Sequence, residues 1–336
     1  MHIPDGFING ATSAGAAVVA AGGVGAALRQ AGQYLQDKRI PLTGLVAAFI
    51  FALQMLNFPV ASGTSGHLLG GALAVILVGP WLGITAVAVV VIVQALLFAD
   101  GGVSALGLNI VNMALITGVV GWLIFRTLVR VLPKTWTSVA VATFAAGVVS
   151  VVASALGFVF EYSLGGVGDA NLGAVFAAMT GVHFLIGIGE GVISLTVVGL
   201  VGATRPDLVA GISGLELSGR AGKLGRSGIG GVIAVGLAVA AILVFVIAPL
   251  ANENPDGLER VAIDQGFDTS ATDSAVADSP LADYNVSGVD DEATSTGVSG
   301  LIGIAVTFAV ALAIVGGFTV LRKRTRSDEQ TKAPAT

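Results

Sequence analysis

Residues 68–79 read Leu68-Leu69-Gly70-Gly71-Ala72-Leu73-Ala74-Val75-Ile76-Leu77-Val78-Gly79, and the topology of the whole chain depends on whether this apolar run crosses a membrane. Its 12 residues make only about 18 Å of helix. A membrane helix needs about 20 apolar residues. The run ends at Gly79-Pro80, so on length alone it could be re-entrant.

Eight longer apolar segments surround this run and indicate the class of protein. The 336 residues are 54% hydrophobic and 11% charged, against about 25% charged in a soluble domain. The 48 glycines suit helices that pack closely through small residues. We expect an all-α, multi-pass protein of the cell membrane, embedded in the lipid bilayer. Its long apolar segments are 11–28, 41–58, 82–99, 105–125, 136–160, 176–200, 229–250 and 300–321.

The basic residues favour a crossing at 68–79. With that crossing, 15 of the 16 Lys and Arg residues fall on one side, and only Arg260 lies opposite. Without it, every later basic loop changes sides. Because cytoplasmic loops are rich in Lys and Arg, this pattern predicts nine crossings with the N-terminus outside and the C-terminus in the cytoplasm.

The chain begins with a polar stub, Met1-His2-Ile3-Pro4-Asp5-Gly6-Phe7, which lacks the basic and apolar regions of a signal peptide. The free amine of Met1, the amide nitrogen of His2 and the His2 Nδ1 can close two small rings around one metal ion. A fourth nitrogen would complete the square-planar coordination that Ni(II) and Cu(II) prefer. The chain has no cysteine, so any metal ligands must be nitrogen or oxygen. The alternative is that a histidine at position 2 arose by chance.

A second histidine lies on the same predicted side of the membrane. His67 ends the glycine-rich loop Ala61-Ser62-Gly63-Thr64-Ser65-Gly66-His67, which is flexible enough to fold inward. His2 and His67 therefore need no membrane crossing to meet.

Polar residues within the apolar segments are further candidates. His183 and Glu190 lie seven residues apart on one helix face, where they could form a proton relay, a second metal site or a packed polar pair. Asn109 and Asn112 share a face, and Asp100 closes the preceding helix; metal binding and interhelical hydrogen bonding both explain them. Asn57 precedes Pro59 and is expected to stabilise a turn or to orient the His67 loop.

The C-terminal third has a different composition. Residues 251–299 hold 11 of the 21 acidic residues, which predicts a largely disordered extracytoplasmic loop. This loop could collect divalent cations, or it could simply be a solvated loop. We divide the chain into a membrane core (1–205), a cytoplasmic linker (206–228), an accessory domain with two membrane helices (229–321) and a basic cytoplasmic tail (322–336).

No enzyme motif is present in the sequence. It lacks a phosphate-binding glycine loop, a zinc-protease helix and a nucleophile elbow. We therefore expect no enzymatic activity, and active transport would need a partner that supplies energy.

Several motifs resemble the CbiM/NikM family, the substrate-capture (S) components of energy-coupling factor transporters for cobalt and nickel. The resemblance covers about residues 1–205, and Asn254-Pro255-Asp256-Gly257-Leu258-Glu259 resembles the PDGLE domain of the NikN/CbiN accessory subunit. The motifs are Met1-His2-Ile3-Pro4-Asp5-Gly6-Phe7, Phe51-Ala52-Leu53-Gln54-Met55-Leu56-Asn57-Phe58-Pro59-Val60, Gly63-Thr64-Ser65-Gly66-His67-Leu68-Leu69-Gly70-Gly71 and Gln94-Ala95-Leu96-Leu97-Phe98-Ala99-Asp100-Gly101-Gly102.

The resemblance implies a seven-helix S-component core with two additional membrane helices. It also implies that Met1, His2 and His67 hold the transported Ni²⁺ or Co²⁺, that no cofactor is needed, and that the partners are a transmembrane coupling protein and two cytoplasmic ATPase subunits. No nucleic-acid partner is expected. The alternatives are a passive metal channel or sensor, an S component for a vitamin and, resting only on His183 and Glu190, an intramembrane enzyme. The square-planar preference favours nickel, whereas many members of the family serve cobalt.

Overall fold

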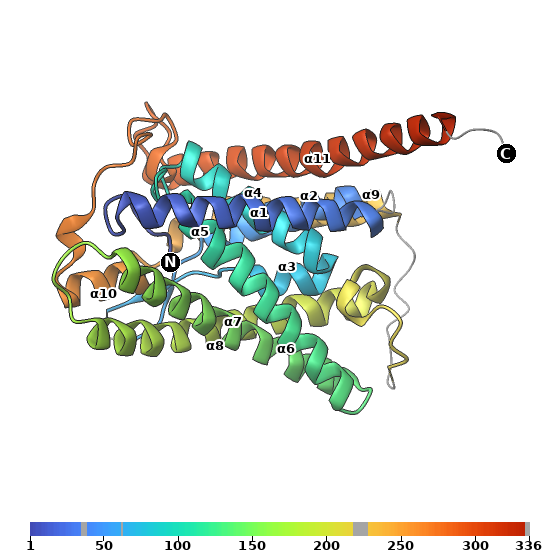
Figure 1. Cartoon of the computed structure of the whole chain (residues 1–336), viewed down its shortest axis with the longest axis horizontal. Helices are drawn as coiled ribbons and strands as arrows, with labels where there is room; N and C mark the ends of the chain where they lie inside the picture. The colour runs from blue at the N-terminus through green and yellow to red at the C-terminus, as the bar shows by residue number, and fades with distance from the viewer. Residues whose placement is uncertain (35–38, 62, 218–227, 333–336) are drawn as a thin grey trace.

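The computed structural model describes residues 1–34, 39–61, 63–217 and 228–332, which form a bundle of helices (Figure 1). Residues 218–227 of the predicted linker and 333–336 of the predicted tail lie outside this part. The helices are α1 (Gly10–Tyr34), α2 (Arg39–Gln54), α3 (Gly71–Val78), α4 (Pro80–Leu97), α5 (Leu106–Ile110), α6 (Thr117–Val131), α7 (Trp136–Gly165), α8 (Leu172–Thr204), α9 (Ile229–Ile242), α10 (Gly257–Gln265) and α11 (Glu292–Lys332). Two short strands, β1 (Phe58–Pro59) and β2 (Ser65–Gly66), pair antiparallel.

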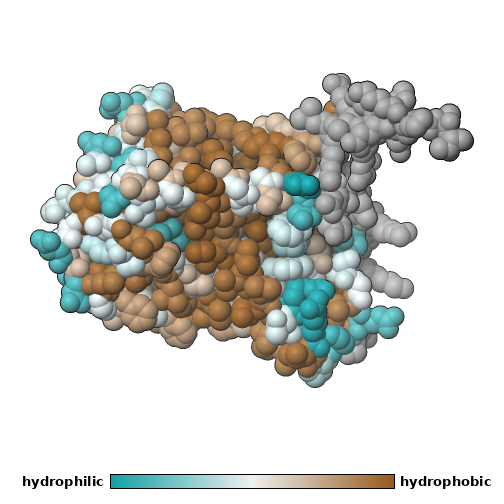
Figure 2. All heavy atoms as spheres, in the orientation of Figure 1, coloured by the Kyte–Doolittle hydropathy of each residue, from teal (hydrophilic) through white to brown (hydrophobic). Residues whose placement is uncertain are grey.

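Seven described helical stretches are long and apolar enough to span a membrane. Large apolar side chains are exposed on them, such as Phe160, Leu200 and Val235. The face drawn in Figure 2 shows a broad apolar band between more polar ends. A multi-pass membrane protein of all-α class is therefore confirmed. The seven stretches are Gly10–Gly32, Pro80–Leu97, Leu106–Val131, Trp136–Gly165, Leu172–Thr204, Ile229–Leu250 and Glu292–Phe318.

Glycine allows the long helices α7 and α8 to pack at backbone distance. A Cβ on Gly147 would lie 2.8 Å from the Cα of Gly191, and one on Gly187 would lie 3.0 Å from the carbonyl oxygen of Val148. Small residues at helix contacts are typical of membrane proteins. This packing fixes the face of α8 that carries His183 and Glu190.

The short apolar run of residues 68–79 is only partly helical. The chain runs from β2 through irregular backbone to Gly70, forms the eight-residue helix α3, and turns back at Gly79 into α4. Non-helical chain advances up to about 3.3–3.6 Å per residue, against 1.5 Å in a helix. The run can therefore extend a few Å farther than 12 helical residues would, and its crossing of the membrane stays a prediction.

Opposite charges gather at opposite ends of the bundle. Arg39 lies beside the turn at Gly79, and Arg126 donates a hydrogen bond to the carbonyl of Gly211, 3.4 Å away. The acidic segment that follows α9, with α10, lies at the other end (Figure 1).

The prediction that residues 251–299 are largely disordered is wrong. This segment contains α10 and the start of α11, and Leu258, Val261 and Phe267 are buried. Its backbone pairs with the N-terminal stub through a bridge between Asp5 and Thr272. The segment folds because its few apolar residues pack against the membrane core, a partner that composition does not reveal.

Candidate metal centre

The N-terminal stub is folded into the bundle rather than extended into solvent. Ile3 is fully buried, and the Asn109 side chain accepts from its backbone N–H at 2.7 Å and donates to its carbonyl at 3.0 Å. The Asp5 carboxylate accepts the backbone N–H groups of Val103 and Ser104 at 3.1 and 2.8 Å. Asn109 thus holds the stub in place, a role that the sequence did not suggest.

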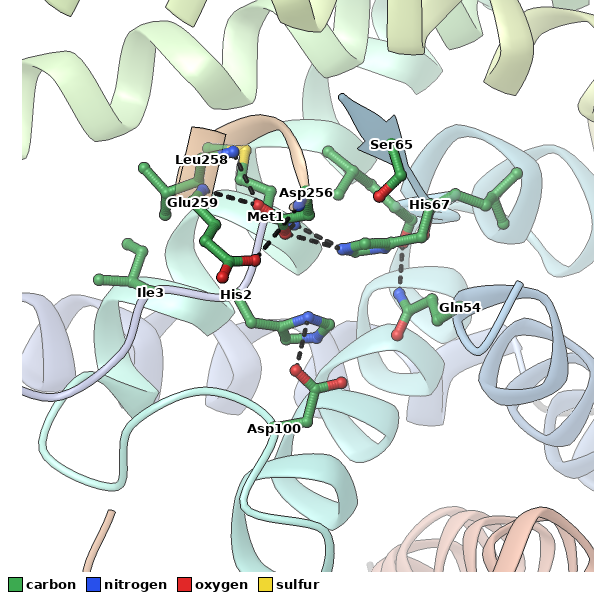
Figure 3. Close-up of polar contacts among 12 residues, drawn as sticks. Met1, His2, Ile3, Gln54, Ser65, His67, Asp100, Asp256, Leu258 and Glu259 are labelled. Carbon is green, nitrogen blue, oxygen red and sulfur yellow. Dashed lines mark hydrogen bonds and ion pairs between the residues drawn. The ribbon is translucent and has the colours of Figure 1, made fainter. Parts of the chain in front are cut away.

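The stub brings the terminal amine onto His67. The Met1 nitrogen lies 2.5 Å from the His67 Nε2, and both residues are buried (Figure 3). The other ring nitrogen, Nδ1, lies 3.0 Å from the carbonyl oxygen of Leu68, which can only accept. This contact assigns the ring proton to Nδ1, so the lone pair of Nε2 faces the amine.

His2 lies next to this pair, but its chelating nitrogen points elsewhere. The His2 and His67 rings are stacked, with centroids 5.0 Å apart. The His2 Nδ1 lies 3.0 Å from Oδ1 of Asp100, and its Nε2 lies 3.1 Å from Oε1 of Gln94. Burial lowers the pKa of His2 to about 4, although Asp100 opposes this, so the ring is neutral near pH 7. A rotation of the ring would be needed to aim Nδ1 at an ion beside the amine.

Residues 251–299, the accessory segment, contribute Asp256, which also reaches the amine. Its Oδ2 lies 2.7 Å from the Met1 nitrogen and 3.7 Å from the His67 Nε2 (Figure 3). Burial by itself raises the pKa of Asp256, but the terminal ammonium and His67 outweigh it and hold the pKa well below its usual range. Asp256 belongs to the motif Asn254–Glu259, which predicted an accessory domain but no role for this side chain.

The residues around Asp256 fix its position. Its Oδ1 accepts the N–H groups of Leu258 and Glu259 at 2.8 and 2.9 Å, while the Glu259 side chain accepts the N–H of Asp256, which makes a capping box for α10. Ser65, two residues before His67, donates its N–H to the Pro255 carbonyl and its hydroxyl to the Asn254 carbonyl. The loop of His67 and the turn of Asp256 are therefore joined to each other.

Glu190 supports the His67 loop from α8. Its two carboxyl oxygens accept the backbone N–H groups of Leu69 and Gly70 at 2.6 and 3.1 Å, and Gln54 donates to the Leu69 carbonyl at 2.8 Å. Irregular backbone inside a membrane protein is tolerated where the protein satisfies its polar groups. Glu190 supplies such acceptors directly after His67.

His183 makes a separate contact. Its Nδ1 lies 2.9 Å from the Met179 carbonyl, and its Nε2 has no hydrogen-bond partner among the described residues. A Cβ on Gly257 would lie 3.2 Å from the His183 ring, so the accessory segment packs directly on it. No hydrogen bond between His183 and Glu190 occurs in the described structure.

The remaining candidates divide between the site and its surroundings. Asp100 lies in the site, against His2. Asn112 instead donates to Glu161 at 2.6 Å, an interhelical hydrogen bond between the α5–α6 segment and α7. Asn57 accepts the N–H of Asn252 through its carbonyl and so joins the β1 turn to the accessory segment.

The chain's two parts match two family descriptions. Residues 2–208 match the family described as cobalt uptake substrate-specific transmembrane region, and residues 230–320 match the PDGLE domain.

Two relatives and one solved structure with similar chains are named for metal transport. A chain of Archaeoglobus fulgidus named as a fused nickel transport protein, NikMN, is 35% identical over 318 residues, which cover 94% of this chain and 98% of that relative. The fused nickel transport protein NikMN of Rhodobacter capsulatus is 38% identical over 116 residues, 34% of this chain and 33% of that one. Among solved structures, the crystal structure of a transition metal transporter superposes with a TM-score of 0.54 at 31% identity and covers 60% of this chain and 92% of its own.

Proposed function

The chain belongs to the cobalt uptake substrate-specific transmembrane family and is a membrane component of cobalt or nickel transport, and on this premise we propose that it captures Ni²⁺ or Co²⁺ with Met1, His2 and His67. The ligands in this proposal are the terminal amine, the amide nitrogen and Nδ1 of His2, and Nε2 of His67. The chain is not an enzyme, and the metal ion is its cargo. A nitrogen donor set of this kind suits Ni(II).

The contact between the amine and His67 is the observation that carries the proposal. For metal–nitrogen bonds of about 2.0–2.1 Å, adjacent square-planar ligands lie about 2.9 Å apart. The Met1 nitrogen and the His67 Nε2 are 2.5 Å apart, with the Nε2 lone pair facing the amine. Two of the four proposed donors therefore already have nearly the spacing that one ion requires.

Loading in this proposal needs one movement and the release of protons. The His2 ring rotates by half a turn about its Cβ–Cγ bond, and this rotation moves Nδ1 away from Asp100 and towards the amine. The amine and the His2 amide must each lose a proton before they can bind metal, and a free α-amine titrates near 7.7–8.0 in model peptides. Metal affinity should therefore fall as the pH drops below neutral.

We further propose that the site faces outside and that ATPase partners drive delivery. The acidic segment and the metal centre share one end of the bundle, while Arg39 and Arg126 lie at the other, as the positive-inside rule requires of a cytoplasmic end. In this scheme the loaded protein reorients against a transmembrane coupling protein that is powered by two cytoplasmic ATPase subunits. The accessory segment assists loading through its contact with the amine.

Calorimetry on three histidine variants tests the ligand set. We expect His2→Ala and His67→Ala to abolish Ni(II) binding by the purified full chain, and His183→Gln, the matched control, to retain it. Binding by either of the first two at wild-type affinity would refute the proposed site.

Reconstitution distinguishes ATP-driven import from a passive channel. We expect vesicles that contain this chain alone to show no uptake of radioactive Ni²⁺, and uptake to appear when coupling protein, ATPase subunits and ATP are added. Uptake by this chain alone, without ATP, would support the channel instead.

A further inference from the structure

The backbone is unusual at one contact between the accessory segment and the core. Ala99, Asp283 and Tyr284 are the non-glycine residues with positive φ among those that the structure describes, at 54°, 53° and 58°. Such conformations are uncommon outside glycine, and they concentrate at functional sites. All three residues lie at or beside the hydrogen bond between Tyr284 and Asp100. The fold thus maintains an unfavourable backbone on both sides of this one bond.

Tyr284 is held firmly against the core. Its ring stacks on Phe98 with centroids 4.9 Å apart, and the backbone N–H of Asp283 donates to the Phe98 carbonyl at 2.8 Å. Ser299, about two turns into α11, donates to the Tyr284 carbonyl at 2.5 Å. Burial and the Asp100 carboxylate raise the pKa of Tyr284 well above its usual value, so the hydroxyl keeps its proton and remains a donor.

One hydroxyl group fixes both partners of the His2 ring. The Tyr284 hydroxyl donates to Oδ2 of Asp100 at 2.5 Å and accepts from Nε2 of Gln94 at 3.0 Å. The remaining oxygens of these side chains, Oδ1 of Asp100 and Oε1 of Gln94, face the Nδ1 and Nε2 of His2. The orientation of each oxygen towards the imidazole is therefore set by Tyr284.

This arrangement suits a metal-bound His2 better than a free one. A neutral imidazole has a single N–H, yet both of its nitrogens face acceptors here, so only one contact can be a hydrogen bond. A ring bound to metal through Nδ1 carries its proton on Nε2, and such a ring nearly always donates that proton to a carboxylate or carbonyl. The proposed half-turn would leave Nε2–H beside Asp100 and Gln94 as acceptors and would move Nδ1 away from the Asp100 oxygen it now faces.

We propose that Tyr284 is a positioning residue of the metal centre, through which the accessory domain orients Asp100 and Gln94 as the outer partners of the His2 ligand. The inference rests on the proposed function, because it requires His2 to bind the ion. It gives the accessory domain a second contact with the site, on the side of His2 opposite to the amine and Asp256.

Removal of one hydroxyl tests the inference. Tyr284→Phe keeps the ring on Phe98 and deletes only the contacts to Asp100 and Gln94, and Tyr162→Phe, whose hydroxyl donates to Val167 instead, is the matched control. Loss of an outer partner of a metal ligand typically weakens affinity by 10–100-fold. We expect Ni(II) affinity of the full chain to fall at least about 10-fold in Tyr284→Phe and to stay unchanged in Tyr162→Phe.

Two further measurements separate positioning from a merely structural effect. The ¹⁵N shifts of the His2 ring report which nitrogen carries the proton, and we expect them to change in Tyr284→Phe while the melting temperature of the metal-free protein matches that of Tyr162→Phe. Asp100→Asn should lower affinity as well, and the double variant should lose less than the product of the two single effects, because both act through one pair.

The outcomes distinguish this inference from the proposed function. Wild-type Ni(II) affinity and ring shifts in Tyr284→Phe, combined with lost binding in His2→Ala, would overturn the role of Tyr284 and leave the ligand set intact. Wild-type binding in His2→Ala would overturn both.

Discussion

Replacement of Glu190 by alanine removes both acceptors of the backbone that follows His67. The N–H groups of Leu69 and Gly70 would then be buried without partners, since they now donate to Glu190 at 2.6 and 3.1 Å. A buried donor left unsatisfied costs about 1–3 kcal/mol, so the two together destabilise this conformation of the loop by about 2–6 kcal/mol. Only the ordered loop presents His67 to the metal. Once the destabilisation exceeds the free energy that keeps the loop ordered, each further 1.4 kcal/mol lowers metal affinity about tenfold.

Calorimetric titration of Ni(II) into the full chain measures this loss. We expect Glu190→Ala to bind at least about tenfold more weakly than wild type. Glu190→Gln keeps the volume and one acceptor oxygen, so its loss should be smaller. The matched control is Glu161→Ala, which removes another buried glutamate from the neighbouring helix α7, where it accepts from Asn112 and not from a loop amide.

Hydrogen exchange at two amides checks the reason for the loss. The amides of Leu69 and Gly70 should exchange faster in Glu190→Ala and remain protected in Glu161→Ala. Wild-type affinity together with unchanged protection in Glu190→Ala would refute the reasoning, because the loop would then not depend on this carboxylate.

Three further predictions concern the stub and the accessory segment. Burial lowers the pKa of His2 to about 4, against about 6.5 unfolded, so the docked stub should have its full stability above pH 6.5 and lose up to about 3 kcal/mol as the pH falls towards 4. Hydrogen exchange of the stub amides measures this loss of stability. An equal pH dependence of exchange in His2→Gln would contradict the prediction. Asp256→Asn keeps the α10 cap but leaves the terminal ammonium without its carboxylate, so the unfolding free energy of the metal-free protein should fall by about 1–3 kcal/mol in thermal unfolding. The exposed control Asp264→Asn should change this free energy by less than about 1 kcal/mol. Equal effects of the two variants would argue against a stabilising buried pair. A Cβ on Gly257 would lie 2.6 Å from an isoleucine side chain of α8, so Gly257→Ala should lower the free energy of unfolding by about 1–3 kcal/mol in the same thermal assay. The control Gly181→Ala has open space around its Cβ and should not destabilise the protein. Wild-type stability of Gly257→Ala would mean that the packing between α10 and α8 is loose.

Hydropathy predicted most of the helices. The long apolar segments correspond to helices, while the crossing at 68–79, which the distribution of basic residues favours, stays a prediction. The shape of that run could not be foreseen, because its irregular backbone depends on an acceptor from Glu190 and a donor from Gln54, both on other helices. Hydropathy describes each segment alone and contains no information about such partners.

The metal centre was predicted only in part, for a related reason. The chelating arrangement of Met1 and His2 is local in sequence, the predicted topology placed His67 on the same side, and the motif resemblance assigned it as a ligand. Asp256 and Tyr284 contact the site from 255 and 190 positions away along the chain, within a segment whose acidic composition indicated disorder. The capping-box pattern from Asp256 to Glu259 was a readable sign of a helix start, and it could have argued against disorder there.

The central claim is that an unblocked terminal amine binds the transported ion together with two imidazoles. Calorimetry with Ni(II) should compare the full chain with its native N-terminus against the same chain carrying one additional N-terminal residue, which moves the amine away from His67 and puts a peptide bond in its place. We predict tight binding of one ion by the native form and none by the extended form. Equal binding by the two forms would contradict the account.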